Sequence, residues 1–337
     1  MLSRIGSVSG RAPALLLPGL LLLSGCAAAR PPVVLPPARL AAAEPVCAPG
    51  QRDPGGDRIG FVFGGGGAKA AYEAGIALAF AERGVVPAAV AGTSSGALSA
   101  VMVATREEAR LAALWRTIRR DDVFRVPAPV VFGGLLPAWL AVSTLSDLGS
   151  LLDPTPLRRT LEREVDLRRV RESPIRVLVL TADLLSGRPR RFDNGTLSVE
   201  ALVASATVPG LFPPVVLPDA ALVDGGIVER APTLELLAAH PVDQLFVVLA
   251  YESDPPRGTS VREVLERVFE IALGREILRD VELARARYPL VDIHVLRPSE
   301  PLRLRPLDFD SGRLGQLVDL GRRDGLTCLD TLGRWRR

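Results

Sequence analysis

The chain has 337 residues, of which 48% are hydrophobic and 23% are charged, and its formal net charge at pH 7 is +3. This size suits one large domain or two small ones. The near balance of charge excludes the basic surface that nucleic-acid binding needs, and acidic residues with calcium-ligand spacing are missing from the sequence, so we expect neither nucleic acid nor a metal as a partner.

The first 25 residues have the pattern of a signal peptide. Arg4 and Arg11 precede a short apolar run, residues 12–23, which is too short to span a bilayer comfortably. The run ends in Leu-Ser-Gly-Cys, and these residues resemble a bacterial lipobox whose cysteine, here Cys26, would be lipidated and become the mature N-terminus. The alternative is an ordinary signal peptide with a cysteine nearby by accident.

A lipidated Cys26 would anchor the protein stably, because each buried methylene of an acyl chain adds about 0.8 kcal/mol. We therefore expect a lipid-anchored protein of the bacterial cell envelope. Ala27 follows Cys26, and by resemblance to the enterobacterial sorting rule this favours the outer membrane, facing the periplasm or the cell surface. Residues 26–57 are rich in alanine and proline and predict a semi-extended tether, so the folded domain is expected at residues 58–337.

Three cysteines leave an odd number for pairing. If Cys26 carries lipid, Cys47 and Cys328 remain in an oxidising compartment where disulfides persist. They lie before and near the end of the domain, so a bridge between them would tie its two ends together. Two free, partly buried thiols are the alternative.

From residue 58 onward, short apolar runs alternate with helical stretches. The runs predict buried strands at 58–63, 87–92, 174–184, 220–226, 244–252 and 290–298, and the intervening pattern predicts helices that include 68–84, 95–104 and 261–287. This alternation predicts an α/β fold: a three-layer α/β/α sandwich with a mostly parallel central sheet. Residues 126–152 depart from the pattern, being apolar with prolines and glycines, and are interpreted as core or as a lid that meets lipid.

Four glycines, Gly64 to Gly67, follow the first predicted strand and precede Lys69, the only lysine in the chain. Such a run can bind phosphate, bind a dinucleotide or form an oxyanion hole. A phosphate-binding P-loop requires Gly-Lys-Ser/Thr, but Ala68 and Ala70 flank Lys69 here. A dinucleotide fold requires an acidic residue at the end of the second strand, which lacks one, so we expect no cofactor.

The sequence Gly-Thr-Ser-Ser-Gly, residues 92–96, fits the Gly-x-Ser-x-Gly pattern of a nucleophilic serine between a strand and a helix. Gly92 and Gly96 would permit the tight turn, and Ser94 would be the nucleophile. The other interpretation is a turn that only caps a helix. His240, in a predicted helix-to-strand linker, and His294, within a predicted strand, are poorly placed to act as its base, so a carboxylate is favoured. Asp224 ends a predicted strand before Gly225 and Gly226, where neighbouring backbone can approach closely.

In this order and spacing, the motifs resemble those of the patatin-like phospholipase family, from about residue 58 to residue 298. The matching stretches are Gly64 to Lys69, Gly92 to Gly96, Ala204 to Val215 and Asp224 to Gly226. The resemblance implies a Ser94–Asp224 dyad, an oxyanion hole formed by the N–H groups of Gly65, Gly66 and Gly67, and Lys69 in a supporting role. The expected activity is hydrolysis of lipid or phospholipid acyl esters.

Two positions depart from the family pattern: Ala70 stands where glycine is usual after the basic residue, and Arg230 and Ala231 precede Pro232 where asparagine is frequent. A second function therefore stays open, in which a catalytically weak lipoprotein of this fold binds lipid or a protein partner without turnover. Both residues of the dyad are present, which argues for an enzyme.

Overall fold

The computed structural model describes residues 47–48, 58–128, 130, 149–250 and 261–333. The signal peptide, Cys26, most of the tether and most of residues 126–152 lie outside these ranges, so the lipid anchor and the lid stay predictions. Among the residues described, each helix is too short or too polar to cross a bilayer.

The described strands form one nine-stranded mixed sheet. Its centre consists of parallel strands in the spatial order β9 (Asp292–Leu296), β8 (Gln244–Val248), β2 (Ile59–Phe63), β3 (Ala89–Thr93) and β4 (Arg176–Asp183). All five lie within or next to the apolar runs that predicted strands. Nearly every residue in them is buried, as expected for parallel strands covered on both faces.

Antiparallel strands form the two margins of the sheet. On one side β4 pairs with β5 (Arg188–Asp193) and with β7 (Ala220–Asp224), and β7 pairs with β6 (Val215–Leu217). Neither β5 nor β6 was predicted, because β5 consists mainly of arginines and other polar residues and β6 is an apolar run of only three residues. On the other side β1 (Cys47–Ala48) pairs with β9, so the boundary at residue 58 is corrected: part of the predicted tether belongs to the sheet.

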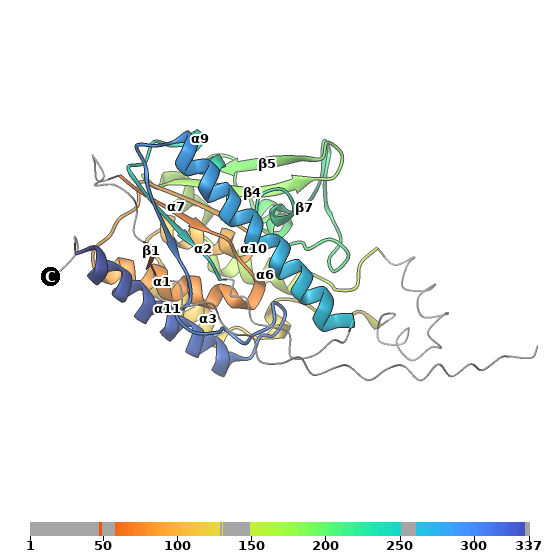
Figure 1. Cartoon of the computed structure of the whole chain (residues 1–337). Helices are drawn as coiled ribbons and strands as arrows, with labels where there is room; N and C mark the ends of the chain where they lie inside the picture. Colours follow the sequence, from red (N-terminus) through yellow and green to blue (C-terminus); the bar gives the residue numbers. More distant parts are fainter. Residues whose placement is uncertain (1–46, 49–57, 129, 131–148, 251–260, 334–337) are drawn as a thin grey trace, which may run out of the picture.

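Helices cover both faces of the sheet and complete the three-layer sandwich (Figure 1). Phe61 and Phe63 of β2 pack on one side and the intervening Val62 on the other, as the two-residue period of a strand requires. The first face carries most of the helices: α1 (Ala71–Glu82), α2 (Ser95–Ala104), α3 (Glu108–Thr117), α8 (Val199–Ser205) and α11 (Ser311–Leu332). The second carries α9 (Thr233–Ala239) and α10 (Val261–Arg287).

The remaining helices are short or peripheral. They are η1 (Gly67–Ala70), η2 (Arg120–Asp122), α6 (Thr155–Glu164), α7 (Leu167–Glu172) and η3 (Gly225–Ile227). Among them, η1 begins at the last residue of the glycine run, and η3 directly follows Asp224. Both therefore help to determine where those residues lie.

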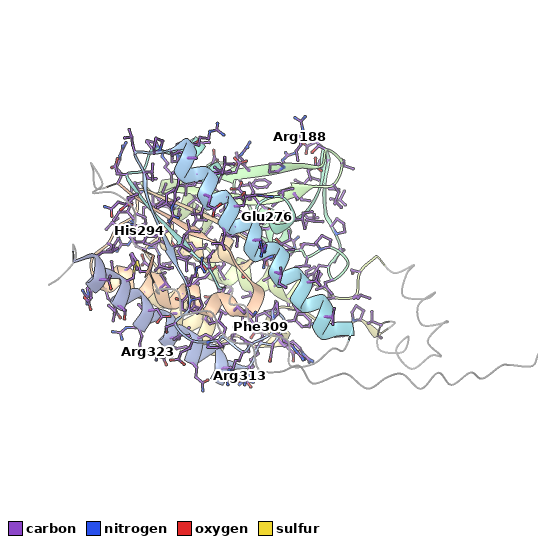
Figure 2. The ribbon with its side chains drawn as sticks, viewed as in Figure 1. Arg188, Glu276, His294, Phe309, Arg313 and Arg323 are labelled. Carbon is purple, nitrogen blue, oxygen red and sulfur yellow. A yellow bond between two sulfur atoms is a disulfide. The ribbon has the colours of Figure 1, made fainter. Side chains whose placement is uncertain are left out.

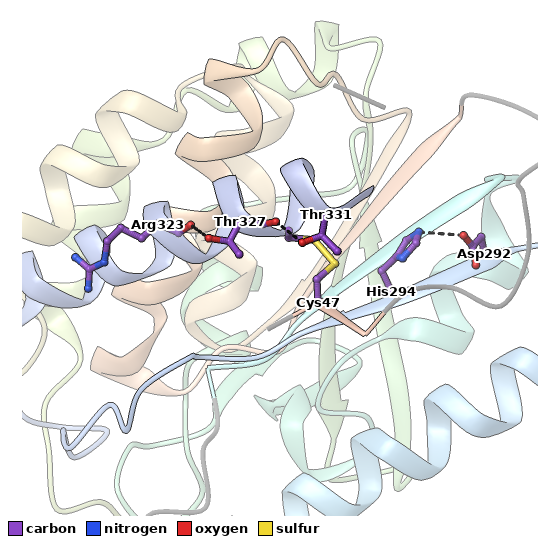
Figure 3. Close-up of a disulfide and its surroundings, with 7 residues drawn as sticks. Cys47, Asp292, His294, Arg323, Thr327 and Thr331 are labelled. Carbon is purple, nitrogen blue, oxygen red and sulfur yellow. Dashed lines mark hydrogen bonds and ion pairs between the residues drawn. A yellow bond between two sulfur atoms is a disulfide. The ribbon is translucent and has the colours of Figure 1, made fainter. Parts of the chain in front are cut away.

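The C-terminal helix α11 packs along α1 and is joined to the start of the domain by a disulfide. Cys328 of α11 is bonded to Cys47 of β1, and both are buried (Figure 3). The pairing that the sequence left open is therefore present in the structure. Through this bond, the edge strand β1 and the last helix hold one another against the body of the fold.

Candidate active site

Ser94 lies in the turn that joins β3 to α2, and its backbone has the unusual angles φ 57° and ψ −136°. A non-glycine residue held in such a conformation costs on the order of 1–3 kcal/mol and persists only when its surroundings enforce it. Here the Ser94 N–H donates to Ser205 Oγ of α8 at 3.0 Å. Ser94 is half-buried, whereas Thr93 before it is fully buried.

The glycines around Ser94 allow backbone segments to touch. A methyl group on Gly96 would lie 2.3 Å from Phe63 O, and one on Gly92 would lie 2.1 Å from Gly96 O. A methyl group on Gly65 would lie 2.5 Å from Thr93 O, and Gly65 also has φ 67°. The glycine loop and the serine turn are thus packed backbone against backbone.

Asp224 reaches the same place from an antiparallel strand. Only the last residues of β4 pair with β7, which sets Asp224 opposite Thr181, while the neighbouring Leu180 lies opposite Thr93 of β3. The end of β7 therefore lies close to the end of β3, with only β4 between the two strands. Gly225 is required here, because a methyl group on it would lie 2.5 Å from Leu180 O.

The Asp224 carboxyl is buried, with 5% of the residue exposed. Its Oδ1 accepts from the Gly226 N–H at 2.8 Å. Burial raises the pKa of Asp224, and the Gly226 N–H, the charge of Arg230 and the Ser94 hydroxyl oppose that rise. A carboxylate with a raised pKa is a stronger base than one in water.

The glycine loop turns through three consecutive positive φ angles, 67° at Gly65, 136° at Gly66 and 60° at Gly67. The Gly65 N–H donates to Glu73 Oε1 at 2.7 Å. That donor is already used inside the protein, so the prediction that Gly65 contributes an oxyanion-hole N–H is corrected. For Gly66 and Gly67 the oxyanion hole stays a prediction; Gly67 is packed against Pro306 O, which lies 2.1 Å from where a Cβ would stand.

Lys69 lies in η1 and only 3% of it is exposed. Lysine is almost never fully buried unless it is paired, so this residue is part of the interior around the loop and is not a surface charge.

Ala70, the departure from the family pattern, has φ −65° and ψ −8°. An alanine adopts these angles without strain, so glycine is not needed there.

Three buried residues at the site were missed by the sequence analysis: Glu73, Ser205 and Glu229. Glu73 is on α1, where burial raises its pKa to about 8. Burial likewise raises the pKa of Glu229 to about 8. A signal for Glu73 was available, since Ala71, Ala74 and Ala77 surround it in a helix with no polar face, which indicates burial on all sides.

Arg230, the second departure, lies beside the dyad. Its Nη1 is 3.5 Å from where a Cβ on Gly226 would stand, and its charge lowers the pKa of both Asp224 and Glu73 against the larger effect of burial. Burial also raises the pKa of Glu276 on α10, which is labelled in Figure 2, and Arg230 is among the charges that oppose this rise. A cation therefore stands where the family frequently has an amide.

Neither histidine is near the serine. His294 is 2% exposed in β9, stacks on Phe246 with ring centroids 4.7 Å apart, and has Nε2 3.1 Å from Asp292 Oδ2 (Figure 3). Two strands, β8 and β2, separate it from β3. His240 follows α9 at its C-terminal cap, in the linker to β8. In the part of the chain that the structure describes, no three His, Cys, Asp or Glu side chains are grouped so as to hold a metal ion.

A serine on a strained strand-to-helix turn, beside a glycine loop and the strand end that carries a buried carboxyl, fits the Gly-x-Ser-x-Gly pattern of the α/β hydrolases. The Patatin family model, described as patatin-like phospholipase, matches residues 61–237, which include the glycine loop, Ser94 and Asp224. The chain belongs to the patatin-like phospholipase family.

Relatives and solved structures are similar but distant. Uncharacterised NTE family proteins of Mycobacterium tuberculosis and Mycobacterium bovis are 24% identical over 231 residues, which is 68% of this chain and 59% of each relative. VipD from Legionella pneumophila is 15% identical with a TM-score of 0.42, covering 86% of this chain and 71% of its own. ExoU of Pseudomonas aeruginosa, solved with SpcU, is 16% identical with a TM-score of 0.40, covering 82% and 52%.

Proposed function

We propose that the protein is a serine acyl hydrolase that cleaves lipid or phospholipid acyl esters through a Ser94–Asp224 dyad. The observation that carries the proposal is the convergence of the Ser94 turn, where φ is 57°, with the end of β7, which holds the buried Asp224 carboxyl: Asp224 lies opposite Thr181, and the neighbouring Leu180 lies opposite Thr93. The Ser94 hydroxyl is also among the groups that lower the pKa of Asp224. Membership of the patatin-like phospholipase family supports the lipid substrate class.

In this mechanism Asp224 accepts the hydroxyl proton while Ser94 Oγ attacks the ester carbonyl. The tetrahedral intermediate collapses to acyl-Ser94, and the proton on Asp224 passes to the departing alcohol. Asp224 then takes a proton from water, whose oxygen attacks the acyl-enzyme, and returns that proton to Ser94 Oγ as the fatty acid is released. Because the pKa of Asp224 is raised by burial, its carboxylate accepts the proton more readily than a solvated one would.

The N–H groups of Gly66 and Gly67 are the proposed donors to the oxyanion, and one such donor is typically worth about 3 kcal/mol of barrier. The backbone contact between Gly65 and the serine turn supports this assignment, because it brings the loop against the turn that presents Ser94. Lys69, buried in η1, supports the loop from within the protein.

We also propose that lipid on Cys26 anchors the enzyme at the outer membrane, where its substrates would be membrane lipids or lipid fragments. The support is the lipobox-like sequence that ends at Cys26 and the alanine- and proline-rich stretch that follows it. A disulfide between Cys47 and Cys328 agrees with an oxidising compartment outside the cytoplasm.

The test is turnover of p-nitrophenyl acyl esters and of phospholipid vesicles, together with labelling by a fluorophosphonate probe. We expect S94A and D224N to lose turnover, and S94A to lose labelling as well. Ser95→Ala, next to the nucleophile, and Asp219→Asn, on the exposed β6–β7 turn, are the matched controls. Undiminished turnover in S94A or D224N would remove the dyad, and a wild-type protein that binds lipid but is neither labelled nor active would indicate a binding protein.

A further inference from the structure

Glu73 joins the two halves of the active site. It is 0% exposed, and its carboxyl contacts the glycine loop on one side and helix α2, which begins directly after Ser94, on the other. We propose that Glu73 is a positioning residue that fixes the Gly65 peptide and thereby aims the N–H groups of Gly66 and Gly67 at the oxyanion. This inference rests on the proposed hydrolase activity.

The contacts of the two carboxyl oxygens are distinct. Glu73 Oε1 accepts from the Gly65 N–H at 2.7 Å, and Oε2 is 3.1 Å from Ser99 Oγ, whose residue is also fully buried. The neighbouring Gly64 N–H donates elsewhere, to Val248 O at 3.3 Å. The Glu73 side chain therefore connects helix α1, on which it lies, with the glycine loop and with helix α2.

The loop needs such a connection because glycines are conformationally free. Gly65, Gly66 and Gly67 all have positive φ, and no side chain of their own holds them there. A buried N–H without an acceptor is costly, so removing the Glu73 acceptor would let the Gly65 peptide rotate toward another partner. Rotation of that peptide would also turn the next N–H away from the position of the oxyanion.

The charge on Glu73 matters as well as its position. Burial raises its pKa to about 8, so the carboxyl gains its charge only near and above that pH, while Oε1 accepts from the Gly65 N–H and Oε2 accepts from the Ser99 hydroxyl. Among the charged groups, Arg230 favours the ionised form of Glu73 and of Asp224, and Lys69 lies one turn earlier in the chain. Above pH 8 an ionised Glu73 would place a negative charge behind the donors that must stabilise an oxyanion.

The experiment compares Glu73→Gln and Glu73→Leu with the wild-type protein. Glutamine keeps an acceptor for Gly65 and a hydrogen-bonding group for Ser99, so E73Q should retain kcat at pH 7, while E73L should lose kcat by about 100-fold or more with little change in KM. Wild-type activity should fall several-fold as the pH rises through 8, and E73Q should lack this fall. Glu108→Gln and Glu108→Leu are the matched controls, since Glu108 is a buried carboxyl of α3 away from the site.

A folded E73L with normal kcat, or an E73Q whose activity falls above pH 8 as in the wild type, would overturn the inference. If E73L does not fold, the E73Q profile decides. If the wild-type protein has no hydrolase activity, the proposed function fails, and [15N]glycine NMR spectra then decide about Glu73. Glycine amides that titrate near pH 8 in the wild type and in E108Q, but not in E73Q, would support its contact with the loop, and the absence of such amides would refute it.

Discussion

Ser205 Oγ accepts a hydrogen bond from the Ser94 N–H at 3.0 Å and donates one to Leu180 O at 2.8 Å. One hydroxyl thus bridges the strained turn of the nucleophile and the central strand β4. Because Ser94 has unfavourable backbone angles, this bridge is part of what holds them.

We therefore expect Ser205→Ala to reduce kcat about tenfold, since a backbone donor left without its acceptor costs about 1–3 kcal/mol. The measurement is kcat with a p-nitrophenyl ester alongside a thermal melt. Ser173→Ala is the control, because the Ser173 hydroxyl also donates to a backbone carbonyl, Ala104 O, away from the site. Equal losses of activity in the two variants would contradict a specific role for Ser205.

Gly65→Ala should abolish activity, whereas Gly84→Ala should only destabilise. Both glycines have positive φ, 67° and 74°, so alanine is strained at either position by about 1–2 kcal/mol. Only at Gly65 does the new methyl group also meet backbone, 2.5 Å from Thr93 O, while Gly84 has open space around it. We expect G65A to lose at least about 100-fold in kcat/KM, as a 1 Å displacement of reacting groups can do. Similar rates for the two variants would show that the loop contact is unimportant.

The acid side of the pH–rate profile should report Asp224. Its folded pKa is raised by burial, and it acts only when deprotonated, so the rate falls as the pH drops through that raised pKa. Arg230 opposes the rise, so Arg230→Gln should move the acid limb to higher pH, and Arg230→Lys should restore it. Arg191→Gln, which removes an exposed arginine paired with Glu235, is the control and should leave the limb in place. If the acid limb does not move in R230Q, Arg230 does not influence the pKa of Asp224.

Loss of the disulfide should lower the free energy of unfolding by about 2–5 kcal/mol. Cys47 and Cys328 are 281 residues apart, so the bond restrains a very long loop of the unfolded chain. We expect C47S, C328S and the double variant to be equally destabilised in urea titrations, because removing either sulfur removes the whole bond. Two reactive thiols in denatured, unreduced wild-type protein would exclude the bridge.

Lipidation predicts that labelled palmitate is incorporated into the wild-type protein and not into a Cys26→Ser variant. Cys47→Ser is the control, because it removes a cysteine without touching the lipobox-like sequence. Label retained by C26S would place the lipid elsewhere, and an unlabelled wild type would favour an ordinary signal peptide.

Helix α1 shows what the local sequence pattern could predict and what it could not. The alanine-rich stretch that ends near Gly84 predicted the extent of the helix. The contacts of its internal charge, Glu73, form only when the glycine loop folds back onto the helix, so the local pattern could not predict them. The strands β5 and β6 were missed for a related reason: β5 is polar and β6 has only three residues, so pairing with β4 and β7 defines them.

The sequence by itself determined the motifs that carry chemistry, because a tight turn requires glycine at particular spacings and an attacking group requires a serine and a base. It also determined the five parallel strands, since burial on both faces demands an unbroken apolar run. Only the tertiary structure decided that β7 runs antiparallel yet brings Asp224 to the sheet edge where Ser94 lies, that Gly65 turns its N–H inward to Glu73, and that the charge of Arg230 acts on two buried carboxyls. These relationships depend on distances between residues far apart in the chain, and such distances are fixed by packing and not by local preference.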